Sequence, residues 1–380
     1  MKLVFASDSF KGSLSSERTA QLLTKAAEEI FDETECFSLP VADGGEGTLE
    51  AVVSATGGGF VEAWARDPMG NPRRTHYGVT GDGRAIIEMA AASGLTLVPA
   101  EQRDPESASS YGTGELIQDA LARGYRDVSV AIGGSATNDG GMGCARALGI
   151  RFLDERGQEL DGIGSDLGRV HSIDMAGLDP RLAGATLTVM CDVTNPLCGP
   201  DGATQTFGAQ KGASQEALQR LEEGMCHYRD VLLRTFGKDA DQMPGAGAAG
   251  GLGAALMILL GANMRSGIET VLDLIGFETL LKEADLVITG EGRTDWQSCH
   301  GKVMQGIGEY ARRRGVPVIG LSGSLGLGAD QILAHGITAL TTTVNAPMEL
   351  DEAMERAEEL YLDAARNMFR MVKVGMKLGK

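Results

Sequence analysis

A glycine-rich segment between a predicted strand and a predicted helix constrains this chain more than any other feature. Residues 128–148 read VSVAIGGSATNDGGMGCARAL. The segment begins with apolar and β-branched residues, as a buried strand does. Five of the eleven residues in 133–143 are glycine, and Met142, Ala145 and Leu148 follow at helical spacing. A strand that leads through glycines into a helix presents unpaired backbone N–H groups, which favour an anion such as phosphate.

Asp139 is an unusual residue for an anion-binding loop. Its carboxylate would repel the anion unless a metal ion lies between them or the carboxylate acts as a base. We therefore interpret the loop as a site for phosphate and Mg²⁺. The alternative is a tight strand-to-helix turn in which Asn138 and Asp139 only cap backbone groups. At this stage both interpretations remain open.

Three further loops place glycine beside a carboxylate at a predicted strand-to-helix junction. They span residues 43–47, 110–115 and 290–295. Parallel sheets bind their ligands at the carboxyl ends of their strands. Turn chemistry alone is a poor explanation for four such loops, so we expect several of them to meet at one crevice that binds a polyanion and a metal.

Two more strand ends carry residues suited to this chemistry. Strand 3–6 is followed by Asp8 and Lys11. Lys11 can neutralise a phosphate, and Asp8 can hold a metal or accept a proton, although an ion pair in a surface loop is the simpler interpretation. Strand 185–190 is followed by Asp192 and Asn195, which are good ligands for a hard cation. The alternative for that pair is a capped turn before proline.

The net charge limits the partners of this chain. Its 380 residues carry a formal charge of −18, which argues against nucleic acid or an anionic membrane as a partner. An acidic protein that binds acidic ligands must use local dipoles, a metal and a few well-placed cations. The six cysteines form no C-x-x-C pair, and we interpret them as reduced. The chain enters a strand directly, and its longest apolar stretch, 252–262, is too short to span a bilayer, so we expect a cytoplasmic protein.

The order of the predicted elements indicates two domains. The alternation of strands and helices in residues 285–342 resembles that of the first sixty residues. We therefore expect an α/β protein in which both chain ends, 1–64 and 284–380, form a Rossmann-like doubly wound domain. Residues 65–283 form an inserted α/β domain that opens with a strand meander. The principal expected strands are 3–6, 36–39, 128–132, 185–190, 285–289, 316–321 and 337–342, and the longer expected helices are 216–236, 303–314 and 350–371.

Five motifs, in order along nearly the whole chain, resemble those of the first class of glycerate kinases. They are DSFKGS at 8–13, ADGGEGT at 42–48, GGSATNDGGMG at 133–143, CDVTNPL at 191–197 and GEGRTD at 290–295, followed by Gly301-Lys302. The chain departs mildly from the family pattern at Ser298, where Thr is frequent, and at Met304 and Gln305, where Pro is common nearby. The resemblance implies an ATP-dependent kinase that phosphorylates D-glycerate, usually to the 2-phosphate, with Mg²⁺, in a cleft between a Rossmann-like domain and an inserted one.

The chain lacks the Walker A and protein-kinase motifs, but phosphoryl transfer requires only positioning, charge neutralisation and a base. The predicted catalytic residues are three cations and two candidate bases, namely Lys11, Arg293, Lys302, Asp8 and Asp43. The predicted ATP-binding residues are Gly44, Gly45, Gly133, Gly134, Ser135, Asn138, Gly290 and Glu291. The predicted Mg²⁺ ligands are Asp139, Asp192 and Asn195. The expected partners are D-glycerate and ATP, with the protein a monomer or homodimer.

Two other functions compete with the kinase. Residues 245–250 match G-x-G-x-x-G and suggest an NAD-dependent hydroxy-acid dehydrogenase. No strand precedes them, so the structural context of that motif is missing, and close packing or a phosphate loop could each explain the glycines. A non-catalytic sensor of sugar acids or nucleotides with the same fold is the second alternative. Glycerate-dependent ADP release distinguishes the kinase from both.

Overall fold

The computed structural model describes residues 1–380 except 11, 40, 42–47, 300–302 and 379–380. The chain divides into two compact units, unit 1 with Met1–Thr56 and Gly267–Lys380, and unit 2 with Gly57–Ser266. Both boundaries fall earlier in the chain than the predicted ones. The first differs because residues 59–66 form a hairpin with the next strand of unit 2, and the second because the two helices after residue 266 pack in unit 1.

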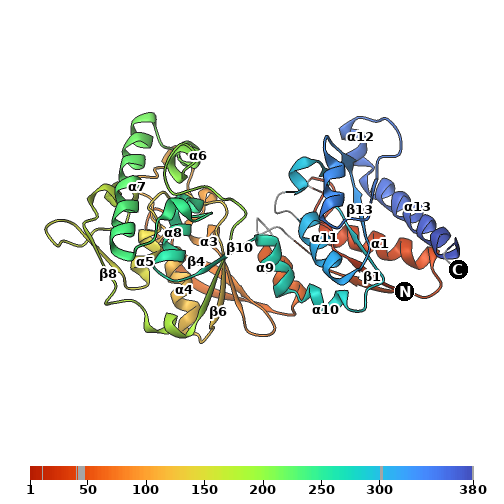
Figure 1. The fold of residues 1–380 in the computed structure, drawn as a ribbon, viewed down its shortest axis with the longest axis horizontal. Coiled ribbons are helices and arrows are strands. Elements are labelled where there is room, and N and C mark those ends of the chain that lie inside the picture. The colour runs from red at the N-terminus through yellow and green to blue at the C-terminus, as the bar shows by residue number, and fades with distance from the viewer. Residues whose placement is uncertain (11, 40, 42–47, 300–302, 379–380) are drawn as a thin grey trace. The chain divides into compact units, whose positions relative to one another are not determined.

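Unit 1 is built on a five-stranded parallel sheet with the order β15-β13-β11-β1-β2 (Figure 1). Its strands are β1 (Lys2–Phe5), β2 (Glu35–Ser38), β11 (Leu286–Thr289), β13 (Val318–Ser322) and β15 (Ala339–Thr342). β1 pairs with β2 on one side and β11 on the other, so the direction of strand addition reverses between β1 and β11. Ligands of open parallel sheets bind outside the carboxyl ends of the strands at such a reversal.

Helices cover both faces of this sheet. From the point of reversal the strands are added in opposite directions, and because each crossover is right-handed, the connecting helices lie on opposite faces. The helices are α1 (Ser16–Ile30), α2 (Thr48–Ala55), α9 (Gly267–Leu274), α10 (Phe277–Leu281), α11 (Val303–Arg314), α12 (Leu350–Glu355) and α13 (Ala357–Leu378). The hydroxyl of Ser15 caps α1 by accepting a hydrogen bond from the Arg18 N–H. Leu23 of α1 and Phe369 of α13 belong to one buried cluster with Phe5 of β1, and truncating such a phenylalanine costs ~3–5 kcal/mol.

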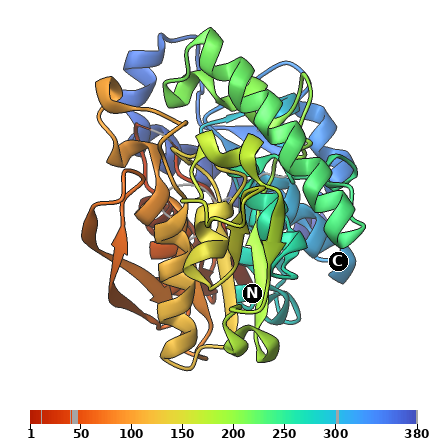
Figure 2. The same ribbon diagram turned by 90° about the vertical axis from the view of Figure 1, so that its left-hand side faces the viewer.

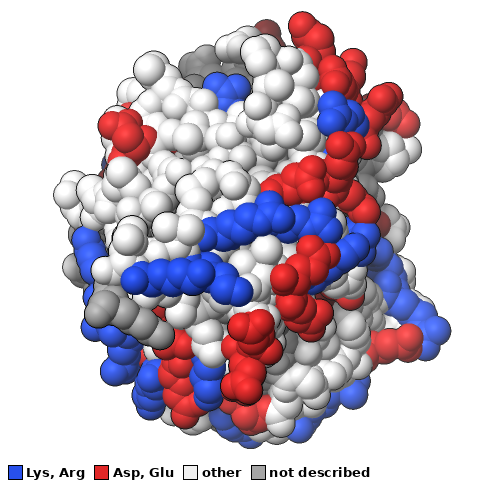
Figure 3. All heavy atoms as spheres, turned by 90° about the vertical axis from the view of Figure 1, so that its right-hand side faces the viewer, with Lys and Arg blue, Asp and Glu red and all other residues white. Residues whose placement is uncertain are grey.

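Ion pairs reinforce the contact between α1 and α13. Arg18 and Glu358 approach to 2.7 Å, and Arg366 and Glu29 approach to 2.6 Å. Figure 3 shows one face of the molecule, on which basic side chains lie between acidic ones. These pairs are screened by solvent, so the apolar cluster beneath them supplies most of the stability of this contact.

Unit 2 contains a six-stranded mixed sheet with the order β10-β9-β6-β5-β4-β3. Its strands are β3 (Gly59–Arg66), β4 (Pro72–Val79), β5 (Ala85–Glu88), β6 (Asp127–Ala131), β9 (Thr186–Met190) and β10 (Asn263–Arg265). β3, β4 and β5 form an antiparallel meander, as the sequence predicts. β5, β6, β9 and β10 are parallel, so their carboxyl ends share one edge.

In unit 2 the sheet is the first layer, and the helices form a second layer and a third. They are α3 (Ala90–Ser93), α4 (Tyr111–Ala122), α5 (Met142–Ala147), α6 (Ala203–Phe207), α7 (Gln215–Phe236) and α8 (Leu252–Ile258), and β7 (Arg151–Leu153) pairs with β8 (Ser172–Asp174) nearby. Leu116 and Ile117 of α4 pack in one buried cluster with the sheet. α7, the long green helix of Figure 2, packs through Met225 and Tyr228 in a second cluster with α5 and α8.

The prediction of an α/β fold with parallel sheets is confirmed. The strand order of unit 1 is the flavodoxin-type order, in which the first strand lies beside both the second and the third. The predicted helix over 350–371 is interrupted at Arg356, so that α12 and α13 are separate helices. Within the described part of the chain, no helix is both long and apolar enough to cross a membrane.

Candidate functional site

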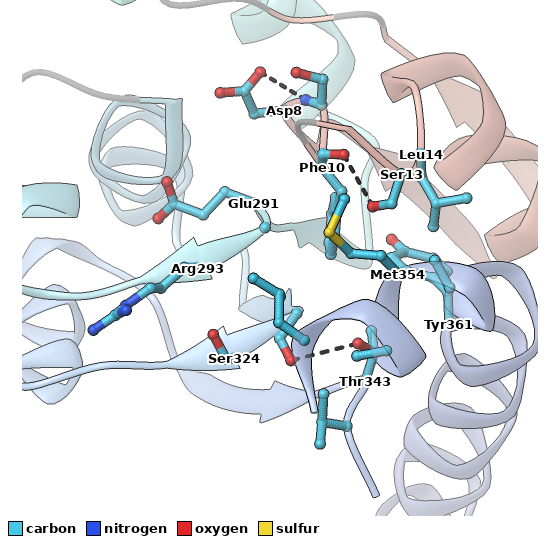
Figure 4. Close-up of a pocket in the computed structure, with 17 residues that line it drawn as sticks. Asp8, Phe10, Ser13, Leu14, Glu291, Arg293, Ser324, Thr343, Met354 and Tyr361 are labelled. Carbon is cyan, nitrogen blue, oxygen red and sulfur yellow. Dashed lines mark hydrogen bonds between the residues drawn. The ribbon is translucent and has the colours of Figure 1, made fainter. Parts of the chain in front are cut away.

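A pocket of about 490 Å³ opens in unit 1 beyond the carboxyl ends of its strands (Figure 4). Its walls come from the loops after β1, β11, β13 and β15 and from α12 and α13. Three of the predicted site residues, Asp8, Glu291 and Arg293, line it. Pockets of this size accommodate ligands as large as a nucleoside.

Asp8 follows β1 at the point where the strand order reverses. Its backbone N–H donates to the carbonyl of Gly290 at 2.9 Å, which ties the loop after β1 to the loop after β11. Gly290 is required at this junction, because a Cβ there would lie 1.9 Å from the carbonyl oxygen of Leu321 in the neighbouring strand. The carboxylate of Asp8 accepts a hydrogen bond from the Ser9 N–H at 2.6 Å, so the carboxylate is held against its own loop.

Glu291 is held in place by hydroxyl groups. Its Oε1 accepts hydrogen bonds from the hydroxyls of Thr294, at 3.1 Å, and Ser298. Thr294 in turn lies 2.7 Å from the hydroxyl of Ser322, at the end of β13. This chain of hydroxyls joins the loops after β11 and β13. A carboxylate fixed in this way can accept hydrogen bonds from a ligand with little loss of side-chain entropy.

Arg293 lies in a short parallel ribbon in which β12 (Arg293–Thr294) pairs with β14 (Ser324–Leu325). Its side chain is 67% exposed and faces Asp295 with 3.6 Å between Nε and Oδ2. An exposed pair at this distance contributes less than ~1 kcal/mol, so the guanidinium can exchange this partner for a ligand carboxylate or phosphate at small cost.

The remaining wall of the pocket is apolar. It consists of side chains from the loop after β1 and from the two C-terminal helices, namely Phe10, Leu14, Leu350, Ala353, Met354, Ala357 and Tyr361. The pocket thus has a charged end beside the strand termini and an apolar wall beside α12 and α13. Sequence reasoning missed this wall, because its residues occur in an ordinary amphipathic pattern. Ser324 also lines the pocket, and the Ser-Gly-Ser sequence at 322–324, where β13 ends, was the sequence signal that could have indicated it.

In unit 2 the contacts of Asp139 match the second interpretation of its loop, in which the carboxylate caps backbone groups. Its carboxylate is fully buried and accepts four hydrogen bonds, from the backbone N–H and hydroxyl of Ser110 and the N–H groups of Gly141 and Gly143. The donors at 141 and 143 belong to the start of α5. The anion at this helix terminus is therefore the chain's own carboxylate, as the alternative interpretation of a capped turn expects. The Mg²⁺ ligand at Asp139 and the phosphate at the start of this helix stay predictions.

Burial determines the electrostatics around Asp139. It raises the pKa of the Asp139 carboxyl above its usual range, while the hydrogen bonds from Ser110 and from residues 141 and 143 lower it in part. Lys211, which is 2% exposed, donates through Nζ to the carbonyl oxygen of Thr137 at 2.7 Å. Desolvation lowers the pKa of Lys211 to about 7, and the charge of Asp139 opposes this shift. Sequence reasoning did not assign a role to Lys211.

The other predicted nucleotide residues of this loop fall into two groups. Asn138 is fully buried and donates through Nδ2 to the hydroxyl of Thr204 at 3.0 Å, which suits positioning rather than direct contact. Ser135 is also buried and forms an isolated bridge with Gly94. Gly133 and Gly134 are exposed just beyond β6, and a Cβ at residue 133 would meet nothing within 4 Å. Their backbone is the part of the loop that a ligand can approach.

Asp192 and Asn195 follow β9, the neighbour of β6 in the sheet. Asp192 is exposed, and its Oδ1 accepts from the hydroxyl of Ser266, beyond β10, at 3.0 Å. Asn195 is half-buried and donates through Nδ2 to the carbonyl oxygen of Asp201 at 2.7 Å. This contact occupies the amide nitrogen and leaves the oxygen as the ligand atom that the side chain offers. These two positions retain the hard oxygen chemistry that a Mg²⁺ ion prefers.

Close packing explains two glycine segments for which the sequence allowed a ligand. In the segment 245–250, a Cβ at Gly247 would lie 2.0 Å from the carbonyl oxygen of Pro196, and one at Gly250 would lie 2.0 Å from that of Thr137. In the predicted loop 110–115, a Cβ at Gly112 would lie 2.0 Å from the carbonyl oxygen of Arg66. The motif-based reason for a dinucleotide site therefore disappears, and the loop 110–115 serves packing and the Asp139 network.

Five of the predicted site residues lie outside the described residues. They are Lys11, Asp43, Gly44, Gly45 and Lys302. The structure brings Asp8, Gly290, Glu291 and Arg293 together in unit 1. In unit 2 it places Gly133 and Gly134 and the pair Asp192 and Asn195 beyond adjacent strands.

Comparisons with known proteins agree on one family. The model of the glycerate kinase family matches residues 3–373. The glycerate 2-kinase of Escherichia coli K12 is 47% identical over 378 residues, which are 99% of each chain. The glycerate kinase of Bacillus subtilis 168 is 45% identical and covers 98% of each chain. A crystal structure from Salmonella typhimurium LT2, described as a candidate glycerate kinase 2, matches with a TM-score of 0.87 at 45% identity and covers 99% of both chains.

Proposed function

Because the chain belongs to the glycerate kinase family, we propose that it transfers the terminal phosphoryl group of ATP to D-glycerate, with Mg²⁺, and forms 2-phosphoglycerate. The observation that carries this proposal is the meeting of Asp8, Glu291 and Arg293 at one pocket of unit 1, where the strand order reverses. Phosphoryl transfer needs a proton acceptor, a cation and fixed positions for both substrates, and this pocket offers groups for each.

The charged end of the pocket suits the acceptor substrate. Arg293 binds the carboxylate of glycerate, because a guanidinium donates two parallel hydrogen bonds to a carboxylate. Asp8 accepts the proton of the attacking hydroxyl as the bond to phosphorus forms. The contact between the Asp8 backbone and Gly290 supports this role, since it holds the carboxylate at the strand terminus.

The apolar wall of the pocket suits the nucleotide. The side chains of Leu350, Met354 and Tyr361 fit a flat, weakly polar ring such as adenine. Glu291, fixed by Thr294 and Ser298, accepts hydrogen bonds from ribose hydroxyls. The other predicted residues that remain part of the proposal are Lys11, Asp43, Gly44, Gly45, Gly133, Gly134, Ser135, Asn138 and Lys302.

Mg²⁺ fits the chemistry of Asp192 and Asn195 better than that of Asp139. Both offer hard oxygen atoms beyond β9, whereas the carboxylate of Asp139 is fully engaged by backbone and hydroxyl donors. When bound, the ion neutralises phosphate charge. The hydroxyl of Ser266 orients Asp192 for this purpose.

The proposal is tested by measuring glycerate-dependent ADP formation and by NMR of the product from ¹³C-labelled D-glycerate. We expect the ¹³C signal of C2 in the product to show coupling to phosphorus. Asp8→Asn should lower kcat by ~10² or more, the usual contribution of a general base. Asp32→Asn, an exposed carboxylate of the same unit, is the matched control and should leave kcat unchanged. ADP formation that does not depend on glycerate would overturn the proposal.

A further inference from the structure

Three side chains of unit 2 form a cluster that the proposed reaction does not use. The sulfur atoms of Cys198 and Cys226 and a carboxylate oxygen of Glu222 all lie within 4.8 Å of one another. Glu222 and Cys226 are four residues apart on α7 and therefore share one face of the helix. Cys198 belongs to the loop that follows Leu197, and its sulfur lies beside these two side chains. Among the described residues, this is the group of histidine, cysteine and acidic side chains that has the spacing of metal ligands.

The surrounding hydrogen bonds hold this cluster in shape. The backbone N–H of Cys198 donates to Oδ1 of Asp241 at 2.9 Å, and the N–H of Gly199 donates to Oε1 of Glu222 at 2.7 Å. Asp241 is itself paired with Arg229 at 2.8 Å, so its charge is already balanced. The loop that carries Cys198 is thus fixed to α7 through Gly199 and Glu222 and to Asp241 through the N–H of Cys198, as a preorganised site requires.

One atom of the cluster lacks a partner. Oε2 of Glu222 is buried and accepts no hydrogen bond from the described residues. A buried carboxylate oxygen without a partner is destabilising, and such an atom in a native structure calls for an explanation such as a bound ion.

We propose that Cys198, Glu222 and Cys226 bind a thiophilic divalent cation of the zinc type, with a water molecule in the fourth position. Two sulfur ligands and one oxygen select zinc over Mg²⁺, which takes oxygen ligands. Sulfur ligands of tetrahedral zinc lie ~3.8 Å apart, from a Zn–S distance of ~2.3 Å. The cluster therefore needs a contraction of less than about 1 Å, which side-chain rotation provides. The ion would join α7 to the loop that carries Cys198.

The test is a titration of the metal-free, reduced, full-length protein with Co²⁺, which reports thiolate ligation by a charge-transfer band. We expect one cobalt per chain, with the spectrum of a tetrahedral site, and displacement by Zn²⁺. Cys226→Ser should remove the charge-transfer band, and Glu222→Gln should weaken binding at least ~10-fold. Cys36→Ser, a half-buried thiol of unit 1, is the matched control and should leave the titration unchanged.

Folding of each variant is checked by circular dichroism, and the half-buried positions Cys226 and Glu222 are preferred to the buried Cys198 for this reason. A wild-type protein that gives no thiolate–cobalt band under reducing conditions overturns the proposal. A band that persists in folded Cys226→Ser, or that Cys36→Ser removes equally, also overturns it. The readout is independent of kinase activity, so failure of the proposed function leaves this test intact.

Discussion

Replacing Asp139 by Asn tests whether this carboxylate is a structural clamp. The substitution keeps the shape of the side chain but removes its charge and turns one acceptor into a donor. In the wild type, Oδ2 accepts from the N–H and hydroxyl of Ser110, at 2.7 Å each, and from the Gly143 N–H at 3.2 Å, while Oδ1 accepts from the Gly141 N–H at 3.0 Å. In its better orientation, Asn keeps the first three bonds in weaker form and leaves the Gly141 N–H unpaired.

The magnitude follows from these contacts. A hydrogen bond to a charged group contributes ~1.5–3 kcal/mol, and a buried donor without a partner costs ~1–3 kcal/mol. Removing the charge relieves part of the desolvation that raises the pKa of Asp139. We therefore expect Asp139→Asn to lower the free energy of unfolding by roughly 2–4 kcal/mol.

The assay is urea unfolding followed by circular dichroism, with Asp161→Asn, an exposed carboxylate of the same unit, as the control. The same measurement is repeated with added Mg²⁺. A structural clamp predicts that Mg²⁺ changes the stability of the wild type and of Asp139→Asn equally. A loss of stability below ~1 kcal/mol, or a Mg²⁺ response that only the wild type shows, would refute this reasoning and restore Asp139 as a metal ligand.

Three further predictions concern other parts of the molecule. Burial lowers the pKa of Lys211 from 10.5 to about 7, so between these values the unfolded chain holds more protons. The free energy of unfolding of the wild type should therefore rise with pH from about 7 to 10, by up to ~1.4 kcal/mol per pH unit. Urea unfolding of the wild type and of Lys211→Met measures this, and the same pH dependence in both proteins would contradict it. Gly290→Ala forces a Cβ against the Leu321 carbonyl and should lower the free energy of unfolding by at least ~3 kcal/mol, as thermal unfolding measures. The control is Gly375→Ala, whose Cβ meets nothing within 4 Å and which should leave stability unchanged or raise it. Met354→Glu puts a charge in the apolar wall and should raise KM for ATP ~10-fold with an unchanged Tm; an unchanged KM would place the nucleotide elsewhere.

The placement of Asp8 and Glu291 at one edge of the unit 1 sheet could be predicted because it follows from topology. Asp8 and Glu291 come directly after strands, and the carboxyl ends of parallel strands share one edge of a sheet. The family and the phosphotransferase activity predicted from the motifs are confirmed by the comparisons. The apolar wall could not be predicted, because Met354 and Tyr361 line one pocket with Asp8 only through the packing of α13 on α1, with α12 beside α13.

The sequence left two roles open for Asp139, and it could not decide between them for a related reason. A carboxylate in a glycine loop indicates a ligand site when its partners are unknown, and here the partner is Ser110, which lies 29 residues earlier. The local pattern is the same whether the helix terminus binds an external anion or an internal one. The cluster of Cys198 and Cys226 gave no signal either, because the loop and the helix that bring the two thiols together are separate in the sequence.

The central claim is that Asp8 and Arg293 act on the same substrate at the pocket of unit 1. A double-mutant cycle on kcat/KM for D-glycerate, with Asp8→Asn, Arg293→Gln and both together, tests it most directly. Each single variant should lower kcat/KM by a factor of ~10² or more. The double variant should lower kcat/KM by much less than the product of the two factors, because both groups serve one transition state. Turnover of either single variant close to the wild type, or losses that multiply fully, would contradict the account.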